Sequence, residues 1–314
     1  MSICLGVVMD PIEEISVATD STLAMLLEGA RRNWRIHYFE PADLFVRDGK
    51  AFGRSRRLHV SHDPLHWEFS DQTIISLSDL DIILMRKDPP VDMNYLYITY
   101  ILELAEREGV KVFNKPQSLR DANEKFFITH FPDLCPPTLV TSDMHRLRDF
   151  FIEQKDIVCK PLDNMAGAFV FRVQVNDMNA SVIFETLTRK GKTPIMAQRF
   201  IPEIVHGDKR ILLIHGEPVP YALARIPAPG ELRGNVNAGA TGVAQPLTEQ
   251  DKRICGVLGP HLRQKGLLFV GIDVIGNFLT EINITSPGCI RQLDEQCGLN
   301  IGKQLFDAMA GGQI

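Results

Sequence analysis

The sequence predicts an α/β protein, with α+β character in its later part, whose first third forms an open parallel sheet with helices on both faces. Apolar runs at 3–9 and 80–85 each end in a turn or charged loop and are followed by a helical pattern. Strand–helix–strand alternation of this kind builds Rossmann-like sheets. Ligands of such sheets bind beyond the strand C-termini, so we expect the loops at 10–21, 86–92 and 114–120 to line a crevice.

The remaining elements are assigned from periodicity and from capping or turn residues. In the first part we expect a helix after the N-cap pair Asp20-Ser21, strands at 36–39 and 110–113, a polar hairpin or loop at 47–73, and a helix at 93–107. In the second part we expect a helix opening at 121–125, another at 143–154, and strands at 138–141, 156–160, 169–173 and 195–200. In the third part we expect strands at 211–214 and 219–225, a long loop at 227–241, a helix at 248–264 and a hairpin at 270–284.

Length and composition limit the functional classes. A chain of 314 residues is expected to form two or three domains, and 45% hydrophobic residues are ordinary for a globular protein. The net charge of −5 gives no global basic field that would recruit nucleic acid. Six cysteines lack metal or C-x-x-C spacing, and no apolar run reaches 18 residues. We therefore expect a cytoplasmic protein without a membrane partner.

The stretch 270–288 holds the strongest chemical pattern. Asp273 lies between apolar residues of one strand, and Gly276-Asn277 marks a tight turn. Side chains alternate along a strand, so Glu281 and Asn283 share a face, on which we also expect Leu279. Two carboxylates and an amide suit Mg²⁺, which takes few protein oxygens and leaves positions for phosphate. The alternative is a solvent-facing strand. Cys289 lies nearby, but nothing in the sequence supplies a base that would make it a nucleophile.

Basic residues from separate elements could surround a phosphate. Lys160 ends an apolar strand, where a buried ammonium needs an anion, and the turn at 163–168 ends in small residues. The segment 198–201 leaves a strand into a hinge, where its backbone could bind a flat base. With Lys125, these groups and the arginines at 210, 225 and 233 are the parts of a phosphoryl-transfer site. For each basic residue taken singly, a surface ion pair remains the alternative.

Several ordered blocks resemble bacterial glutathione synthetase, an ATP-grasp ligase, over nearly the whole chain. The blocks are Met85-Arg-Lys-Asp-Pro-Pro90, Asn114-Lys-Pro-Gln-Ser-Leu-Arg-Asp121, Asn123-Glu-Lys125, Lys160-Pro161, Gly207-Asp-Lys-Arg210, Leu223-Ala-Arg-Ile-Pro227, Arg233-Gly-Asn235, Thr280-Glu-Ile-Asn283 and Thr285-Ser-Pro287. The resemblance implies an ATP-grasp fold behind the N-terminal sheet. It also implies that γ-glutamylcysteine is joined to glycine through an acyl phosphate, with ATP cleaved to ADP and phosphate.

The same resemblance implies a role for each matching residue. Nucleotide binding falls to Lys125, Lys160, Asn164, Met165, Ala166, Gly167, Gln198, Arg199, Phe200, Ile201 and Asp208, and metal binding to Asp273, Glu281 and Asn283. Arg210, Arg225 and Arg233 are the expected catalytic residues, and Arg86, Asn235, Ser286, Pro287 and Gly288 are expected to bind substrate. The expected cofactor is Mg²⁺, with Mn²⁺ as the alternative, and the family implies a homo-oligomer.

The chain departs from the family pattern in its glycine loop, which reads Asp163-Asn-Met-Ala-Gly167 where the family has Asp-Gly-Met-Gly-Gly. The lid at 227–241 is also poorer in glycine, and Gly288 replaces a threonine. Two further functions stay open: another ATP-grasp amino-acid or peptide ligase, and a non-catalytic ATP-binding regulatory module. The expected domains are an N-terminal domain at 1–121 and two ATP-grasp subdomains at 122–200 and 201–314.

Overall fold

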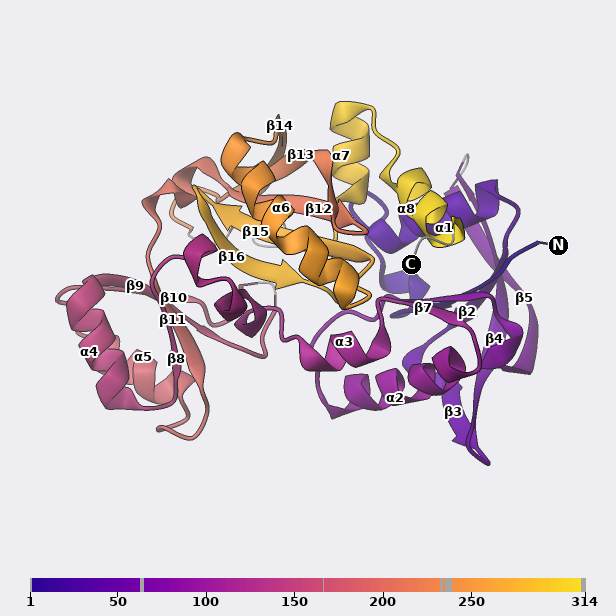
Figure 1. Ribbon diagram of the computed structural model, residues 1–314, viewed down its shortest axis with the longest axis horizontal. Helices are drawn as coiled ribbons and strands as arrows, with labels where there is room; N and C mark the ends of the chain where they lie inside the picture. The colour runs from indigo at the N-terminus through magenta and orange to yellow at the C-terminus, as the bar shows by residue number, and fades with distance from the viewer. Residues whose placement is uncertain (1, 63–64, 166, 232–233, 235–238, 312–314) are drawn as a thin grey trace.

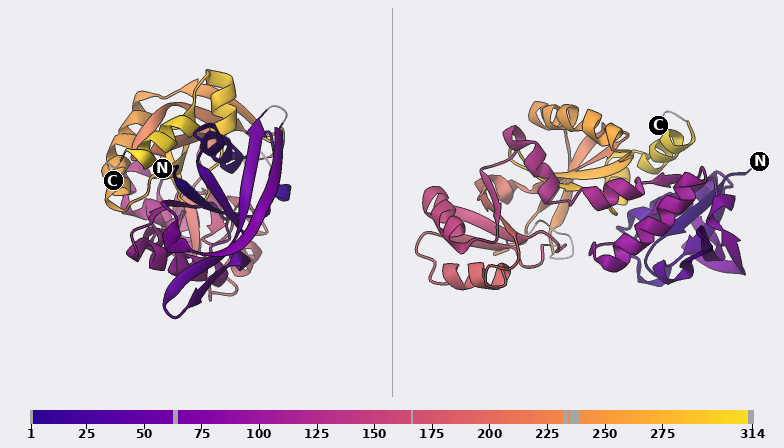
Figure 2. Two further views of the ribbon diagram at one scale, coloured as in Figure 1. Left: turned by 90° about the vertical axis from the view of Figure 1, so that its right-hand side faces the viewer. Right: turned by 60° about the horizontal axis from the view of Figure 1, so that its bottom comes forward.

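Three β-sheets follow one another along the chain in the computed structural model, which describes residues 2–62, 65–165, 167–231, 234 and 239–311. The second sheet forms the lobe at the left of Figure 1, the third lies in the middle, and the first lies at the right. The turned views of Figure 2 show the same succession of three bodies. None of the described helices is both long enough and apolar enough to cross a lipid bilayer.

The first sheet has a parallel centre, as the sequence predicts, with antiparallel strands added on one side. Its order is β3-β4-β2-β1-β6-β7, with β5 paired to β4. Its strands are β1 (Cys4–Val8), β2 (Arg35–Phe39), β3 (Leu44–Arg47), β4 (Lys50–His62), β5 (Leu65–Ser76), β6 (Ile82–Met85) and β7 (Lys111–Phe113). β1, β2, β6 and β7 run parallel, whereas β4 and β5 form the expected polar hairpin.

Helices cover both faces of this sheet, which explains why β1 is apolar throughout. Leu5 and Val7 belong to the core with α1 (Ser21–Arg31), whereas Cys4 and Val8 belong to the core with α2 (Met93–Arg107). Asp20 caps α1 as expected, because its carboxylate accepts a hydrogen bond from the Leu23 N–H at 2.7 Å.

The second sheet is antiparallel, in the order β10-β9-β11-β8. Its elements are β8 (Thr138–Thr141), α4 (Met144–Gln154), β9 (Asp156–Pro161), β10 (Phe171–Gln174), α5 (Ala180–Leu187) and β11 (Ile195–Arg199). The helix predicted to open at 121–125 is wrong: α3 (Pro116–Asp121) ends there. The Asn123 side chain then accepts hydrogen bonds from the N–H groups of Lys125 and Phe126 and leads into a 3₁₀ helix at Phe126–His130.

The third sheet has the order β14-β13-β12-β15-β16 and is antiparallel throughout. Its elements are β12 (Asp208–Ile214), β13 (Glu217–Ile226), β14 (Thr241–Pro246), α6 (Glu249–Gln264), β15 (Phe269–Ile275) and β16 (Phe278–Asn283), followed by α7 (Ile290–Cys297) and α8 (Ile301–Ala310). Six α-helices and β-strands of the described chain are not predicted by the sequence pattern, namely β3, α3, α5, β14, α7 and α8. The predicted lid at 227–241 lies partly outside the described residues.

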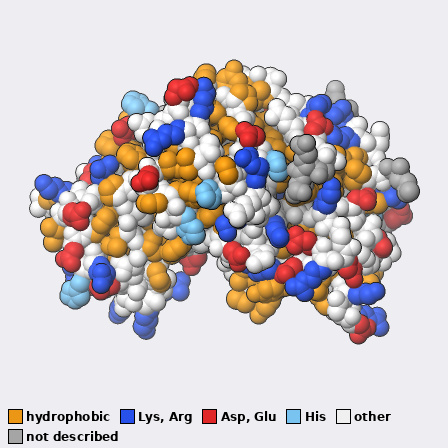
Figure 3. Space-filling view, in the orientation of Figure 1, with side chains coloured by type: hydrophobic (Ala, Val, Ile, Leu, Met, Phe, Trp, Pro, Cys, Tyr) orange, Lys and Arg blue, Asp and Glu red, His pale blue; other side chains and the backbone are white. Residues whose placement is uncertain are grey.

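The C-terminal helix returns to the first sheet. Phe306 and Met309 of α8 share a core with Leu26 of α1, and Arg32 bonds to Asp307 at 2.6 Å. Figure 1 shows α8 beside α1, with both chain ends on the same side of the molecule. In the space-filling view of Figure 3, acidic and basic side chains are interspersed over the visible face.

Candidate active site

The three sheets meet around one large cavity of about 740 Å³. Its walls come from the loops after β1 and β6, the inner strands of the second sheet, and the charged face of the third sheet. The predicted loops at 10–21 and 86–92 contribute to it, as the crevice rule requires. The loop at 114–120 does not, and that prediction is wrong. Asn114 instead bonds to the backbone of Phe269 and Ile284 and anchors the first domain to the third sheet.

The β15–β16 hairpin presents the predicted acidic pair to this cavity. Asp273 lies opposite Glu281 in the strand register, and Asn283 lines the same cavity. The expected position of Leu279 on this face is wrong, because the register shifts next to Asp273 and makes Thr280 an extra residue. Leu279 therefore packs with Ile282 in the apolar core on the other face.

Asp273 is held by two arginines in a buried network. Its carboxylate accepts from Arg210 Nε at 2.5 Å and Nη2 at 3.0 Å, and it lies 2.9 Å from Arg225 Nη2. Arg225 also bonds to Asp208 at 2.5 Å. Burial alone would raise the pKa of Asp273, but the two guanidinium charges outweigh it and hold this pKa below its usual range. Burial raises the pKa of Asp208 to about 6, although Arg225 opposes the shift.

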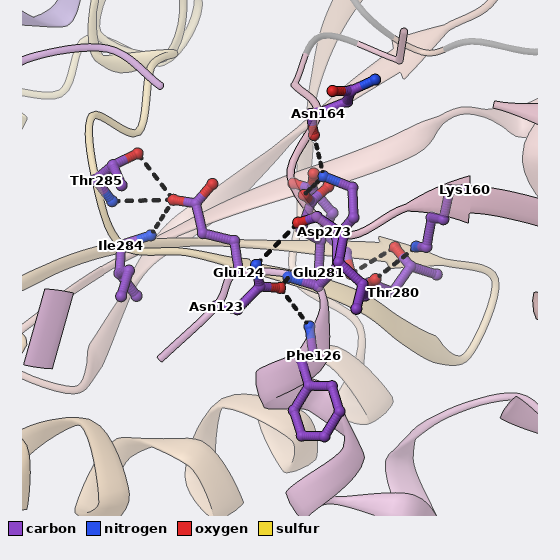
Figure 4. A network of polar contacts seen from close by, with 12 residues as sticks. Asn123, Glu124, Phe126, Lys160, Asn164, Asp273, Thr280, Glu281, Ile284 and Thr285 are labelled. Carbon is purple, nitrogen blue, oxygen red and sulfur yellow. Dashed lines mark hydrogen bonds and ion pairs between the residues drawn. The ribbon is translucent and has the colours of Figure 1, made fainter. Parts of the chain in front are cut away.

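Lys125, which precedes β8, and Lys160 of β9 both approach the same hairpin, and Figure 4 shows Lys160 beside Thr280. Lys125 Nζ lies 3.0 Å from Glu281 and also donates to the backbone oxygen of Asn164. Lys160 donates to the backbone oxygen of Thr280 at 3.1 Å and forms no ion pair within the described residues. Burial lowers the pKa of Lys160, and the charge of Glu281 only partly offsets this. In the described part of the chain, Lys160 is thus a buried cation that lacks an anionic partner.

Unsatisfied polar atoms indicate where a ligand binds. Asp208 Oδ1 and Asn283 Nδ2 are buried without a hydrogen-bond partner in the described structure. Buried polar groups rarely remain unpaired in a complete protein–ligand assembly. Among the described residues, no three or more His, Cys, Asp or Glu side chains form a ready-made metal cage. Two carboxylates and an amide therefore fit a divalent ion that takes its other ligands from phosphate and water.

The predicted nucleotide segment also borders the cavity. Gln198, Arg199, Phe200 and Ile201 all line it, and the Gln198 side chain donates to Thr138 Oγ1 at 3.0 Å. Asn164, Met165 and Gly167 line the opposite rim. Ala166, Arg233 and Asn235 lie outside the described residues.

The predicted substrate residues form the wall next to the first domain. Arg86 is only 7% exposed, and it donates to Thr22 Oγ1 at 3.1 Å and to the Pro287 carbonyl at 3.2 Å. Within the described structure it has no carboxylate partner. Ser286 donates its hydroxyl hydrogen to Asp88, and Gly288 lines the cavity. Cys289 is buried, and burial raises the pKa of its thiol, which disfavours a nucleophilic thiolate.

Glu124 is a functional candidate that the sequence pattern did not predict. Its Oε1 accepts hydrogen bonds from the N–H groups of Ile284 and Thr285 at 2.8 and 3.0 Å and from the Thr285 hydroxyl at 2.9 Å. It therefore fixes the chain directly after Asn283. Its position between Asn123 and Lys125 could have indicated that Glu124 belongs to the site. The helix predicted to open at 121–125 gave no reason to expect its side chain there.

The sequence and the fold both resemble those of known ligases. Residues 3–120 match the sequence model of the prokaryotic glutathione synthetase N-terminal domain, and residues 124–298 match that of its ATP-grasp domain. The chain is 56% identical to the glutathione synthetase of Pseudomonas aeruginosa over 311 residues, covering 99% of this chain and 98% of that one. It is 53% identical to the Vibrio parahaemolyticus glutathione synthetase over 306 residues, covering 97% of each chain.

Solved structures share the fold at low identity. D-cycloserine synthetase DcsG superposes with a TM-score of 0.68 at 16% identity, covering 98% of this chain and 99% of that one. The ATP-grasp ligase PsnB, in complex with its precursor peptide and AMPPNP, gives 0.63 at 18%, covering 98% and 97%. These likenesses confirm the predicted ATP-grasp fold.

Proposed function

Because this chain belongs to the prokaryotic glutathione synthetase family, we propose that the cavity between its three sheets joins γ-glutamylcysteine to glycine. The chain is an ATP-dependent ligase that forms glutathione, and it uses ATP and a divalent metal. The main structural support is the meeting of Asp273, Glu281 and Asn283 with Lys125 and Lys160 on one cavity. This set combines cation ligands with ammonium groups, which is what a triphosphate requires.

The nucleotide lies between the second and third sheets in this proposal. Lys160 supplies its unpaired charge to the phosphates, and Lys125 holds both Glu281 and the glycine loop in place for them. The backbone of 198–201 binds the adenine, and Asp208 lies near the nucleotide. Asn164, Met165, Ala166 and Gly167 cover the phosphates.

The metal proposed at Asp273, Glu281 and Asn283 is Mg²⁺, with Mn²⁺ as the alternative. The two carboxylates and the side-chain carbonyl oxygen of Asn283 fit a hard cation that retains phosphate and water ligands, and the unpaired Asn283 Nδ2 is a donor suited to a phosphate oxygen. When bound, this ion neutralises charge on the phosphate oxygens. Arg210 and Arg225 orient Asp273 through their hydrogen bonds and keep it ionised.

The dipeptide binds on the wall next to the first domain. A buried guanidinium without a counter-ion is costly, so Arg86 is suited to receive a substrate carboxylate. Ser286, Pro287 and Gly288 shape the adjoining backbone, and Asn235 also contacts substrate. The cysteinyl carboxylate attacks the γ-phosphorus of ATP, ADP leaves, and an acyl phosphate forms. The glycine amine then attacks the acyl carbon and releases phosphate. Closure of the 227–241 segment, which carries Arg233, protects the acyl phosphate from water.

Three broader features complete the proposal. The domains are 1–121, 122–200 and 201–314, each centred on one of the sheets. All six cysteines are free, which supports a reducing, cytoplasmic location. The partners are small molecules rather than nucleic acid or membrane, and the chain assembles as a homo-oligomer.

Substrate-dependent release of ADP tests the function. We expect ADP and glutathione only when γ-glutamylcysteine and glycine are both present. A requirement for a different amine would indicate another ATP-grasp ligase. Absence of turnover with every amine would indicate a regulatory ATP-binding module, and either result would overturn the proposal.

A further inference from the structure

Several acidic side chains line the cavity, and Glu124 is one that the proposed machinery does not use. Among the described acids that line it, Asp10, Asp208, Asp273 and Glu281 each form an ion pair with a lysine or arginine. Two more, Glu14 and Asp88, are exposed, and Asp20 caps α1. Glu124 lines the same cavity, is partly buried, and forms no ion pair with any described residue.

The two oxygens of Glu124 differ in their surroundings. Oε1 accepts all three hydrogen bonds from Ile284 and Thr285. Oε2 has no described hydrogen-bond partner, and it is not among the fully enclosed unpaired atoms. In Figure 4 this second oxygen points away from Ile284 and Thr285. Because Oε1 is fixed, Oε2 is held in one direction and is available to a ligand.

Glu124 is also close to the reacting groups in the proposed function. It bonds to the peptide N–H directly after Asn283, and its neighbour Lys125 pairs with Glu281. The carboxylate that becomes the acyl phosphate must lie at this end of the cavity. The amine that attacks it must approach to about 3–3.5 Å, whereas the α-ammonium of γ-glutamylcysteine is a full dipeptide length away.

We propose that Glu124 binds the ammonium group of the incoming glycine at the reacting end of the cavity, before this group gives up one proton to solvent and attacks as the free amine. Oε2 accepts a charge-assisted hydrogen bond from this ammonium, which supplies the cation that Glu124 otherwise lacks. The inference depends on the proposed function, since it assigns one substrate of that reaction to one side chain.

Glu124→Gln tests this assignment with little change in shape. The amide oxygen can still accept from Ile284 and Thr285, but the charge is removed. We expect the KM for glycine to rise by about tenfold, as for loss of one charge-assisted hydrogen bond, with the KM values for ATP and γ-glutamylcysteine within about twofold. Hydroxylamine, which is largely uncharged at mildly alkaline pH, should trap the acyl phosphate equally well in the wild type and the variant.

Two further variants separate binding from positioning. Thr285→Val removes one donor to Oε1 but leaves the Glu124 charge, so the KM for glycine should change less than in Glu124→Gln. Glu106→Gln removes a partly buried acid of α2 outside the cavity and should leave all three KM values unchanged. Thermal unfolding checks that each variant is folded.

Three outcomes would overturn the inference. A selective rise in the KM for γ-glutamylcysteine would assign Glu124 to the dipeptide. A parallel rise in all three KM values, or a fall in kcat alone, would reduce it to a positioning residue for 284–285. Equal loss of activity with glycine and with hydroxylamine would also make Glu124 a positioning residue. Failure of the wild type to form glutathione would instead refute the proposed function.

Discussion

Buried charges on the charged face of the third sheet are paired with opposite charges, whereas two buried cations on the surrounding walls of the cavity are not. On the sheet, Asp273, Arg210, Arg225 and Asp208 neutralise one another. On the surrounding walls, Arg86 and Lys160 are buried cations whose described contacts are with neutral protein groups. Burying a charge without a partner is costly, so a protein keeps such a group where a ligand completes it. In the proposed function, this difference separates the charges that build the site from the charges that bind its substrates.

The largest expected effect follows from breaking the neutral network. Asp273→Asn removes a proposed metal ligand and leaves two buried guanidinium groups with less compensation. We expect kcat/KM to fall by at least about 10³-fold and the free energy of unfolding to fall by about 3 kcal/mol. Urea unfolding and initial rates measure the two effects.

A matched control for this change is Asp251→Asn, which breaks the buried ion pair with Lys209 outside the cavity. It should destabilise the protein without a comparable loss of kcat/KM in the folded fraction. An Asp273→Asn variant with near-normal kcat/KM would contradict the proposed metal site.

Removal of the unpaired Lys160 charge should act on the nucleotide instead. For Lys160→Met we expect the KM for ATP to rise by about 10–100-fold, as for loss of a charge-assisted contact to phosphate. The free energy of unfolding should stay within about 1 kcal/mol, because an uncompensated buried charge is removed. Strong destabilisation would show that Lys160 stabilises the fold and would contradict the distinction between paired structural charges and unpaired ligand-binding charges.

Arg86→Met makes the same test on the dipeptide side. The KM for γ-glutamylcysteine should rise by about tenfold or more, since a substrate carboxylate loses its guanidinium partner. The KM for ATP serves as the internal control and should stay within about twofold. If both constants rise together, Arg86 shapes the whole cavity rather than one substrate's end.

The smallest effect is expected in the glycine loop, which neither set of charges includes. Asn164→Gly combined with Ala166→Gly restores the backbone freedom of the family pattern and should lower the KM for ATP by a few-fold. Steady-state kinetics at varied ATP measures this change. An unchanged or higher value would show that the loop does not limit nucleotide binding.

Much of this arrangement could be predicted from the sequence, because local patterns determine it. The β15–β16 hairpin follows from alternation and a Gly-Asn turn, and α2 follows from its periodicity, whereas the pairing of Asp273 with Glu281 requires the extra residue at Thr280. The predictions that were wrong depend on non-local contacts. The extra residue at Thr280 reversed the face of Leu279, and the bonds from Asn114 to Phe269 took the loop at 114–120 away from the cavity.

For the same reason, the residue types of the site were predicted from the sequence, but their contacts were not. The residue types predicted that Arg210 and Arg225 belong to a phosphate site, but only the structure shows that they bond to Asp273. Glu124 was missed because the sequence does not reveal its surroundings: one of its oxygens is bonded to Ile284 and Thr285, and no described cation pairs with it. A sequence names the charged residues of a site, whereas their pairing depends on the assembled sheets.

The contact between α8 and α1 has a consequence for biosynthesis. The apolar side of α1, including Leu26, is covered by Phe306 and Met309, which a ribosome adds about 280 residues later. The first domain therefore leaves the exit tunnel with one side of its core open and waits for nearly the entire chain before that side closes. During this interval the nascent protein exposes an apolar, aggregation-prone surface, which is the kind of surface that molecular chaperones shield.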